Sequence, residues 1–461
     1  MTLNEYVDSI KDKRIAVIGI GISNEPLIRL LAIEGCNVTA CDKRDFEKLG
    51  TKALELISLG VKLKLGEEYL ENLDYDIIFR TPGLMPFDEH LVSAAEKGSI
   101  ITSEMELFFR LCPCRIIAVT GSDGKTTTTT IISELLKAAG YNVHLGGNIG
   151  KPLLCETPFI SKDDFAVLEL SSFQLHSMYC STDVSVITNI SPNHLDKHKD
   201  FQDYVDAKKS IYRNQRPGGV LVLNYDDEHS PEFEADSHSD IRYFSFESRT
   251  KNGAFFADGK LYRVSNGVER YIINADDILI PGDHNIKNYL AAFTATDGLV
   301  SDEICATVAK SFSGVEHRLE TVRVCRGVRY INDSIGSSPS RTIAGLHALK
   351  TKPIIIVGGY DKKIPFDSLG DELCRMAKAV VFTGATADKI EQAVKASKYY
   401  KDSGLTTYFE ADFKDAVIKA SEVASEGDIV LLSPACASFD NFANFEERGN
   451  YFKKIVMELE E

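Results

Sequence analysis

A glycine-rich segment between an apolar run and a helical pattern carries the clearest chemistry in the sequence. The segment reads Gly121-Ser122-Asp123-Gly124-Lys125-Thr126 and follows the apolar residues 116–119. A strand, a glycine turn and a helix in that order direct backbone N–H groups and a helix N-terminus to one point, which favours a polyphosphate. Lys125 adds a mobile cation, and the Thr126 hydroxyl suits Mg²⁺. We therefore predict a phosphate-binding loop rather than an ordinary glycine turn, although Val119 replaces the first glycine of the full Walker pattern.

Three further side chains have the chemistry to serve the same ligand. Glu169 lies in the apolar run 165–170, and a buried carboxylate is costly without a cation, so we predict a Mg²⁺ ligand rather than an acid at an exposed strand end. His194 follows the next predicted strand and is a candidate second metal ligand rather than an ordinary loop histidine. Lys208 and Lys209 lie in a helical stretch, and composition alone indicates a solvated charged face.

A second glycine loop lies near the N-terminus. The apolar residues 14–18 precede Gly19-x-Gly21-x-x-Asn24, a dinucleotide fingerprint without its third glycine, and Asp42 ends the next predicted strand. The segment 80–83 follows a further predicted strand, where open α/β sheets bind ligands. The pattern predicts a nucleotide-binding α/β unit, with a purely structural turn as the alternative.

Polar residues also gather at predicted element ends in the second half of the chain. Asn285 and Asn288 open a helix, Arg318 follows His317, and Asp333 ends a strand. Each suits polar capping, and Arg318 and Asp333 also suit contacts with a nucleotide across a domain boundary.

Alternation of short apolar runs and helical patterns predicts an α/β chain. At about 150 residues per domain, 461 residues suggest three domains, which we place at 1–103, 104–314 and 315–461. The predicted strands of the three domains are 14–18, 38–41, 61–65 and 76–80; then 116–119, 165–170, 184–189 and 220–223; then 328–332, 354–357, 379–382 and 429–432. Residues 240–280 alternate with period two around Asp258-Gly259, which predicts a small antiparallel addition.

Composition excludes several classes of protein. A formal charge of −16 disfavours binding to nucleic acid or to an anionic membrane surface. The N-terminal residues 1–14 do not resemble a signal peptide, and no apolar run approaches membrane-spanning length. The ten cysteines are scattered, and Cys112 and Cys114 are too close in sequence for usual zinc spacing. We expect a cytoplasmic protein with reduced thiols rather than a disulfide framework, without membrane insertion.

Taken together, these motifs resemble those of the Mur ligases. The resemblance covers nearly the whole length, and its other strong pieces are Gly147–Gly150, Leu168–Gln174, His317-Arg318, Asn332–Ser334, Leu432–Asp440 and Asn444–Gly449. The last two stretches resemble the D-glutamate-adding branch of the family. The family often has lysine after Asn-Asp-Ser, whereas this chain has Ile335.

The resemblance implies an activity and a fold. The activity is ATP-dependent joining of D-glutamate to UDP-N-acetylmuramoyl-L-alanine through an acyl phosphate, in the cytoplasmic synthesis of peptidoglycan precursors and hence in cell shape and division. The fold is α/β with three domains: a Rossmann-like N-terminal domain that binds UDP, a central P-loop ATPase-like domain with the small antiparallel addition, and a Rossmann-like C-terminal domain that binds the amino acid. A monomer is expected, with ATP and two Mg²⁺ sites.

The resemblance also implies roles for individual residues. Catalysis falls to Lys125, His194 and Lys208. ATP contacts are implied for Gly121, Ser122, Asp123, Gly124, Lys125, Thr126, Thr127, Asn285, Asn288, Arg318 and Asp333. The metal ligands are Thr126 and Glu169 for one Mg²⁺, with His194 and Lys208 for the second.

The lysine that matches Lys208 is carbamylated in the family, which reverses the interpretation of Lys208 as a solvated charge. A carbamate offers an anionic oxygen to Mg²⁺, whereas an ammonium repels the ion. Contacts with the UDP substrate are implied for Gly21, Ile22, Ser23, Asp42, Thr81, Gly83 and Asn148, and contacts with D-glutamate for Lys362, Ser438 and Phe445.

Three alternative functions differ from this one. Another amide ligase of the superfamily, adding L-alanine or a diamino acid or extending folate with glutamate, is disfavoured by the stretch 433–438. A nucleotide-sugar oxidoreductase would explain the N-terminal glycine loop but not the phosphate loop with Glu169. A non-catalytic nucleotide-binding relative would not need to retain Lys125, Glu169, His194 and Lys208 together.

Overall fold

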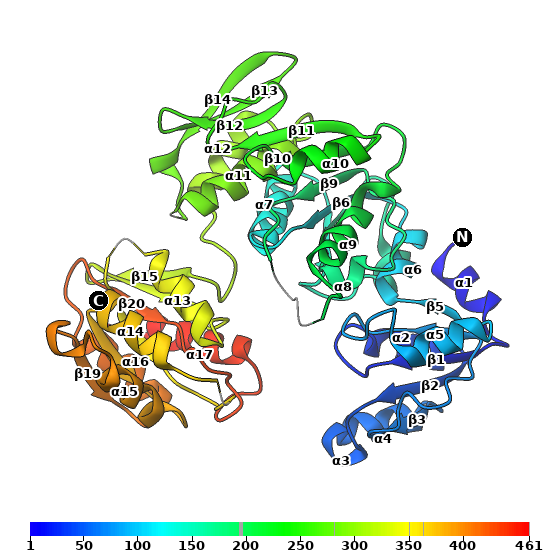
Figure 1. Ribbon diagram of the computed structural model, residues 1–461, viewed down its shortest axis with the longest axis horizontal. Helices are drawn as coiled ribbons and strands as arrows, with labels where there is room; N and C mark the ends of the chain where they lie inside the picture. Colours follow the sequence, from blue (N-terminus) through cyan, green and yellow to red (C-terminus); the bar gives the residue numbers. More distant parts are fainter. Residues whose placement is uncertain (193–196, 281, 350, 363, 461) are drawn as a thin grey trace. The chain divides into compact units, whose positions relative to one another are not determined.

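The computed structural model describes residues 1–192, 197–280, 282–349, 351–362 and 364–460. The chain divides into two compact units, Met1–Ile278 with Asp283–Lys310 and Leu279–Gly282 with Ser311–Glu461. The first unit contains a five-stranded and a nine-stranded sheet, and the second contains a six-stranded sheet (Figure 1). The division into three domains with the predicted boundaries stays a prediction.

The five-stranded sheet is entirely parallel, in the order β3-β2-β1-β4-β5. Its strands are β1 (Arg14–Ile18), β2 (Asn37–Asp42), β3 (Lys62–Leu65), β4 (Ile77–Phe79) and β5 (Ile100–Thr102). The helices of this region are α1 (Leu3–Ser9), α2 (Glu25–Ile33), α3 (Phe46–Leu49), α4 (Thr51–Ser58), α5 (Glu89–Glu96) and α6 (Glu104–Leu111). Because the strands are parallel, the residues that follow β1, β2 and β4 all leave the same edge of the sheet.

The nine-stranded sheet has the order β14-β13-β12-β11-β10-β9-β6-β8-β7. Its strands are β6 (Arg115–Thr120), β7 (Val143–Gly147), β8 (Phe165–Glu169), β9 (Val184–Ile187), β10 (Val220–Asn224), β11 (Asp240–Ser245), β12 (Gly253–Ala257), β13 (Lys260–Ser265) and β14 (Val268–Asn274). The helices of this region are α7 (Lys125–Ala138), α8 (Ser172–Leu175), α9 (Phe201–Arg213), α10 (Ser230–Asp236), α11 (Asp283–Ala295) and α12 (Asp302–Ser311).

The predicted antiparallel addition over residues 240–280 is wrong for its first half. β11 pairs in parallel with β10, and β12 pairs in parallel with β11, so both strands extend the parallel part of the sheet. The antiparallel pairs are β12 with β13 and β13 with β14, and the turn at Asp258-Gly259 joins β12 to β13 as predicted, with both residues at positive φ. Period-two alternation reports one buried and one exposed face and carries no information about strand direction.

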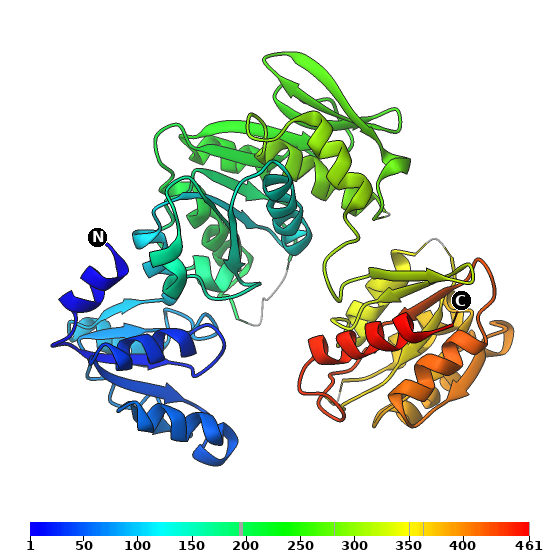
Figure 2. The same cartoon turned by 180° about the vertical axis from the view of Figure 1, so that it is seen from behind.

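The second unit has one sheet, in the order β15-β16-β20-β17-β18-β19. Its strands are β15 (Glu320–Cys325), β16 (Val328–Asn332), β17 (Ile354–Val357), β18 (Ala379–Phe382), β19 (Thr406–Phe409) and β20 (Ile429–Leu432). β15 pairs antiparallel with β16 and the other pairs are parallel. The helices are α13 (Pro339–His347), α14 (Asp367–Met376), α15 (Ala387–Ala396), α16 (Phe413–Glu422) and α17 (Phe445–Glu458) (Figure 2). Separate apolar clusters pack on the sheet.

Four strands of this unit were predicted from sequence, and the edge strands β15 and β19 were not. Both strands are largely half-buried or exposed, so their apolar signal is weak. Within the described part of the chain, none of the helices combines the length and apolar character that a bilayer crossing requires.

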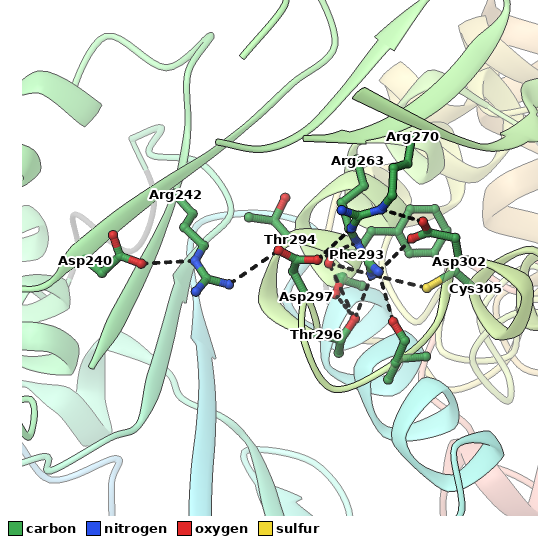
Figure 3. A network of polar contacts seen from close by, with 12 residues as sticks. Asp240, Arg242, Arg263, Arg270, Phe293, Thr294, Thr296, Asp297, Asp302 and Cys305 are labelled. Carbon is green, nitrogen blue, oxygen red and sulfur yellow. Dashed lines mark hydrogen bonds and ion pairs between the residues drawn. The ribbon is translucent and has the colours of Figure 1, made fainter. Parts of the chain in front are cut away.

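An arginine network fastens the antiparallel strands to the helices that follow them (Figure 3). Arg263 on β13 is 1% exposed; its guanidinium donates to the Phe293 carbonyl over 2.9 Å and pairs with Asp302 over 2.8 Å. Arg270 on β14 pairs with the same Asp302 over 2.7 Å and with Asp297 over 3.0 Å. The network therefore fixes the C-terminal end of α11 and the start of α12 against the sheet.

Replacing Arg263 with methionine should lower the free energy of unfolding by about 3–5 kcal/mol, because two largely buried carboxylates then lose a central partner. Urea unfolding of the two proteins measures the difference. Arg249→Met is the matched control, since Arg249 pairs with Glu269 in an exposed position and should leave the midpoint unchanged. Equal midpoints for the two variants would contradict a stabilising role of the network.

Candidate active site

The glycines of the phosphate-loop segment adopt conformations that other residues avoid. Gly121 and Gly124 have φ angles of 146° and 77°. A Cβ atom at Gly121 would overlap Thr188, and one at Gly124 would overlap the Asn288 side chain. Both positions therefore require glycine for shape as well as for backbone angle. The loop leads from β6 into α7, as the sequence predicted.

Side chains between the two glycines tie the loop to the end of β9. The Ser191 N–H donates to Ser122 Oγ over 2.8 Å, and Tyr204 Oη lies 2.8 Å from the same oxygen. The Asp123 N–H donates to Asn189 Oδ1 over 3.0 Å. Among the described residues, no side chain caps the start of α7 at Gly124. The first N–H groups of α7 are thus available to donate hydrogen bonds to an anion held at the loop.

Two lysines donate to the same carbonyl of this loop. Lys125 Nζ lies 3.0 Å from the Gly121 oxygen and 2.8 Å from the Ser122 oxygen. Lys208 Nζ on α9 lies 2.7 Å from the same Gly121 oxygen. Thr126 and Thr127 lie in the first turn of α7, half-buried and buried respectively.

Lys208 is buried, contrary to the composition-based interpretation of a solvated lysine. Its side chain is 1% exposed, and its ammonium lies 4.6 Å from the centre of the Tyr204 ring. Burial, and then the charge of Lys125, lowers the pKa of Lys208 well below its ordinary value, and the charges of Asp123 and Glu169 only partly oppose this. Lys209 instead pairs with Asp206 and Glu232. The helix thus directs two consecutive lysines to different environments.

Glu169 ends β8, directly beside β6 in the sheet. The residue is 1% exposed, and its Oε1 accepts a hydrogen bond from Asn148 Nδ2 over 2.8 Å. Its Oε2 is buried and has no hydrogen-bond partner among the described residues. A buried carboxylate oxygen without a donor is a site that a cation stabilises.

Of the predicted metal ligands, the structure places Thr126, Glu169 and Lys208 on elements that meet at the phosphate-loop segment. Thr126 follows Lys125 in α7, Glu169 lies on the strand next to β6, and Lys208 bonds to the loop itself. His194 lies outside the described residues.

Asn288 connects α11 to the same region. Its Oδ1 accepts from Thr128 Oγ1 on α7 over 3.2 Å, and its Nδ2 donates to Asn285 Oδ1 over 3.3 Å. The helix pair α7 and α11 therefore holds both predicted asparagines near the start of α7.

The N-terminal glycine loop has a different organisation. Asp42, at the end of β2, accepts from the Ile20 N–H over 2.7 Å and forms a two-bond ion pair with Arg44 over 2.8–2.9 Å. Burial opposes ionisation of Asp42, yet the hydrogen bonds from Arg44 and Ile20 hold its pKa below its usual range. Thr81 lies beside Gly19, across the carboxyl edge of the sheet. Gly21, Ile22, Ser23 and Gly83 are exposed along this edge.

The second unit brings another group of predicted residues close to one another. Asp333, at the end of β16, is buried; its Oδ2 accepts from Ser433 Oγ over 2.7 Å and its Oδ1 from the Leu319 N–H over 3.3 Å. Burial raises the pKa of Asp333 to about 7, while the nearby charge of Arg318 acts in the opposite direction. Thus Arg318 and Asp333 are electrostatically coupled within this unit.

The predicted amino-acid ligands lie on two loops and at the first residue of α17 in the same unit. Lys362 is exposed and its Nζ donates to the Ser337 carbonyl over 3.2 Å. Ser438 is buried. Phe445 begins α17, where its ring meets His317 edge to face at 6.0 Å.

A family model described as the Mur ligase middle domain matches residues 119–296, and one described as the Mur ligase glutamate ligase domain matches residues 317–436. A relative from Acetivibrio thermocellus named UDP-N-acetylmuramoylalanine–D-glutamate ligase is 49% identical over 461 residues, with 99% of each chain covered. This chain belongs to the Mur ligase family. A second relative of the same name, from Clostridium novyi, is 48% identical, again with 99% of each chain covered.

Solved structures of other Mur ligases share the fold at low identity. UDP-N-acetylmuramate-alanine ligase from Thermotoga maritima is 18% identical, with a TM-score of 0.58, 96% of this chain and 99% of that chain covered. A structure of MurF from Acinetobacter baumannii is 16% identical, with a TM-score of 0.58, 96% of this chain and 90% of that chain covered. These matches support the mixed α/β Mur ligase fold with mainly parallel sheets.

Two arginines of this Mur ligase, the exposed Arg44 and the buried Arg448, were not predicted as site residues. Arg44 donates hydrogen bonds to Asp42. Its position two residues after an acid at a strand end is the sequence feature that could have indicated this pair. Arg448 lies within the quoted stretch 444–449; it is buried and bonds to both the hydroxyl and the carbonyl of Ser334. Burial lowers the pKa of Arg448 to about 10. Arg448 also donates to the Ala437 carbonyl over 3.1 Å, beside Ser438.

Asp333→Asn should stabilise the second unit at alkaline pH. The folded pKa of about 7 lies above the unfolded value, so the carboxylate destabilises the wild type progressively as pH rises through this window, and the effect levels off above pH 7. The stability difference between variant and wild type should grow by about 2–3 kcal/mol from pH 5 to pH 8. Calorimetric unfolding at both pH values measures it, and a difference that is constant with pH would contradict a raised pKa.

Proposed function

We propose that this chain joins D-glutamate to UDP-N-acetylmuramoyl-L-alanine with conversion of ATP to ADP and phosphate, a cytoplasmic step of peptidoglycan precursor synthesis. The observation that carries the proposal is 49% identity over 99% of both chains with a ligase of that name. A phosphate-loop segment with Lys125, Glu169 and Lys208 around it supports the ATP-dependent part of the reaction.

The reaction requires two displacements. The substrate carboxylate attacks the γ-phosphorus of ATP, the bond from that phosphorus to the β–γ bridging oxygen breaks, and an acyl phosphate and ADP form. The amine of D-glutamate then attacks the acyl carbon, loses a proton, and expels phosphate to leave the amide. Both steps move negative charge between oxygens, so charge neutralisation and positioning matter more than covalent participation of the protein.

The loop residues Gly121 to Thr127 supply the phosphate contacts in this proposal. The uncapped N–H groups at the start of α7 bind phosphate oxygens, and Lys125 moves from the loop carbonyls to the γ-phosphoryl group that is transferred. Asn285 and Asn288 are proposed contacts of the adenosine part, and Arg318 and Asp333 are proposed further contacts of the nucleotide.

The residues present fit a Mg²⁺ site. The unpartnered Glu169 Oε2 is a hard anionic ligand, and the Thr126 hydroxyl is a second oxygen in the proposed set. An ion held by these residues would supply positive charge to the oxygens of the phosphoryl group. We propose His194 and Lys208 as the residues that hold a second ion.

Lys208 fits this role only as a carbamate. Because burial lowers its pKa, the side chain is neutral at a higher fraction than a surface lysine and can add to carbon dioxide, with release of one proton. The product carries an anionic oxygen where an ammonium would repel Mg²⁺. The depressed pKa and the position beside the loop support this modification.

Substrate binding is assigned to the three predicted domains. The strand order β3-β2-β1-β4-β5 is that of doubly wound dinucleotide-binding sheets, which supports a Rossmann-like domain that binds UDP through Gly21, Ile22, Ser23, Asp42, Thr81 and Gly83. Asn148 positions Glu169 and lies toward the muramoyl end of the substrate. Lys362, Ser438 and Phe445 bind D-glutamate in the C-terminal domain, where a cation suits a carboxylate. A monomer suffices for this scheme.

Phosphate release from ATP tests the proposed activity. With UDP-N-acetylmuramoyl-L-alanine present, D-glutamate should raise the rate by at least about tenfold, because a specific acceptor site rejects analogues that leave its polar groups unpaired. L-Glutamate, L-lysine and L-alanine should give no increase above the rate without amino acid. Equal stimulation by all four, or none by D-glutamate, would rule out the assignment.

Lys208→Ala should lower the rate on the order of 10²-fold or more, because the proposed second Mg²⁺ would lose an anionic ligand near the phosphoryl group. Added bicarbonate should restore part of the activity by supplying oxygens to the vacated space. Lys209→Ala is the matched control, since Lys209 faces Asp206 and Glu232, and should keep most of its activity. Full activity in Lys208→Ala would contradict the proposed role of a carbamate at Lys208.

A further inference from the structure

Two histidines and an aspartate form a cluster that the proposed reaction does not use. His176 follows α8, His198 precedes α9, and Asp203 lies in the first turn of α9. His176 Nε2 lies 2.9 Å from Asp203 Oδ1, and His198 Nδ1 lies 2.9 Å from Asp203 Oδ2. The three ligand atoms all lie within 4.8 Å of one another, and the structure contains no ion there.

Packing fixes both imidazole rings. Phe173 stacks on His198 at 5.5 Å with an interplanar angle of 13°, and His176 stacks on the same ring at 5.8 Å with an angle of 27°. The second nitrogen of His198, Nε2, lies 2.9 Å from Ser172 Oγ. A histidine that binds a metal through one nitrogen usually donates from the other to a fixed partner, and Ser172 is placed to be that partner.

The cluster is closed on one side and open on the other. The His198 side chain is fully buried, whereas the side chains of His176 and Asp203 are 16% and 17% exposed. Solvent therefore reaches the Asp203 and His176 side chains, and this is the side from which an ion and a water ligand would enter.

We propose that His176 Nε2, His198 Nδ1 and the Asp203 carboxylate form a binding site for a divalent transition-metal ion of the Zn²⁺ class. Two imidazole nitrogens and one carboxylate oxygen suit Zn²⁺ or Co²⁺, whereas Mg²⁺ prefers oxygen ligands alone. Bonds of about 2.0–2.1 Å in tetrahedral geometry place ligand atoms roughly 3.3 Å apart. The two N···O pairs would open slightly from 2.9 Å, in a cluster whose ligand atoms all lie within 4.8 Å of one another.

Metal entry requires a defined movement of protons. Each ring must present an unprotonated nitrogen to the ion, so the proton of a neutral ring moves to its other nitrogen by exchange with solvent, with no net loss. His176 then carries its proton on Nδ1, and His198 carries its proton on Nε2, which donates to Ser172 Oγ.

Cobalt binding to the full chain, in excess Mg²⁺, tests the site. The wild type should bind one Co²⁺ with the visible absorption of a four- or five-coordinate ion, and His176→Gln should bind it at least about tenfold more weakly without that absorption. His144→Gln is the matched control, because His144 also lies 2.9 Å from an aspartate oxygen, on Asp164, with the same 16% side-chain exposure. This control should bind Co²⁺ as the wild type does.

Thermal unfolding with Zn²⁺ provides the second measurement. Zn²⁺ should raise the midpoint of the wild type and of His144→Gln, but not of His176→Gln or Asp203→Asn, because a ligand stabilises only the state that binds it. Absence of Co²⁺ binding in the wild type, or equal binding by wild type and His176→Gln, would overturn the proposal and leave the cluster as a hydrogen-bond network. Equal loss in His144→Gln would also overturn it.

Discussion

A buried carboxylate oxygen without a hydrogen-bond donor is the constraint around which the first unit is arranged. Glu169 Oε2 has no partner among the described residues, while Asn148 holds the other oxygen. Leaving such a group in a dry environment destabilises the fold by an amount that a nearby cation offsets. Because β8 lies next to β6, Glu169 is close to the phosphate-loop segment, where Lys125 and Lys208 are located.

Parallel pairing explains why residues far apart in sequence meet at this loop. β6 lies between β8 and β9, so the residues after all three strands leave the same edge of the sheet. Ser191 and Asn189, after β9, then bind the loop, and α9 brings Lys208 to the Gly121 carbonyl. The Arg263 network anchors the far end of α11, the helix whose first turns carry Asn288.

The sequence allowed most strands and the loop to be predicted because both depend on local patterns. Apolar runs ending in glycine located β1 and β6, and the Asp258-Gly259 pair located one hairpin turn. Strand direction for β11 and β12 depends on tertiary pairing and could not be read locally. The burial of Lys208 was equally hidden, because a helical pattern shows which face a residue occupies and not what covers that face. Only the family resemblance drew attention to it.

The Gly121 carbonyl accepts from two amines at once, Lys125 and Lys208. The positive charge of Lys125 adds to burial in holding the pKa of Lys208 below its ordinary value. In the proposed mechanism Lys125 moves toward a phosphate, so Lys208 would lose a positively charged neighbour. If Lys208 takes up carbon dioxide as proposed, the order in which nucleotide and carbon dioxide bind would then matter, because a bound nucleotide changes the charge beside the Lys208 amine.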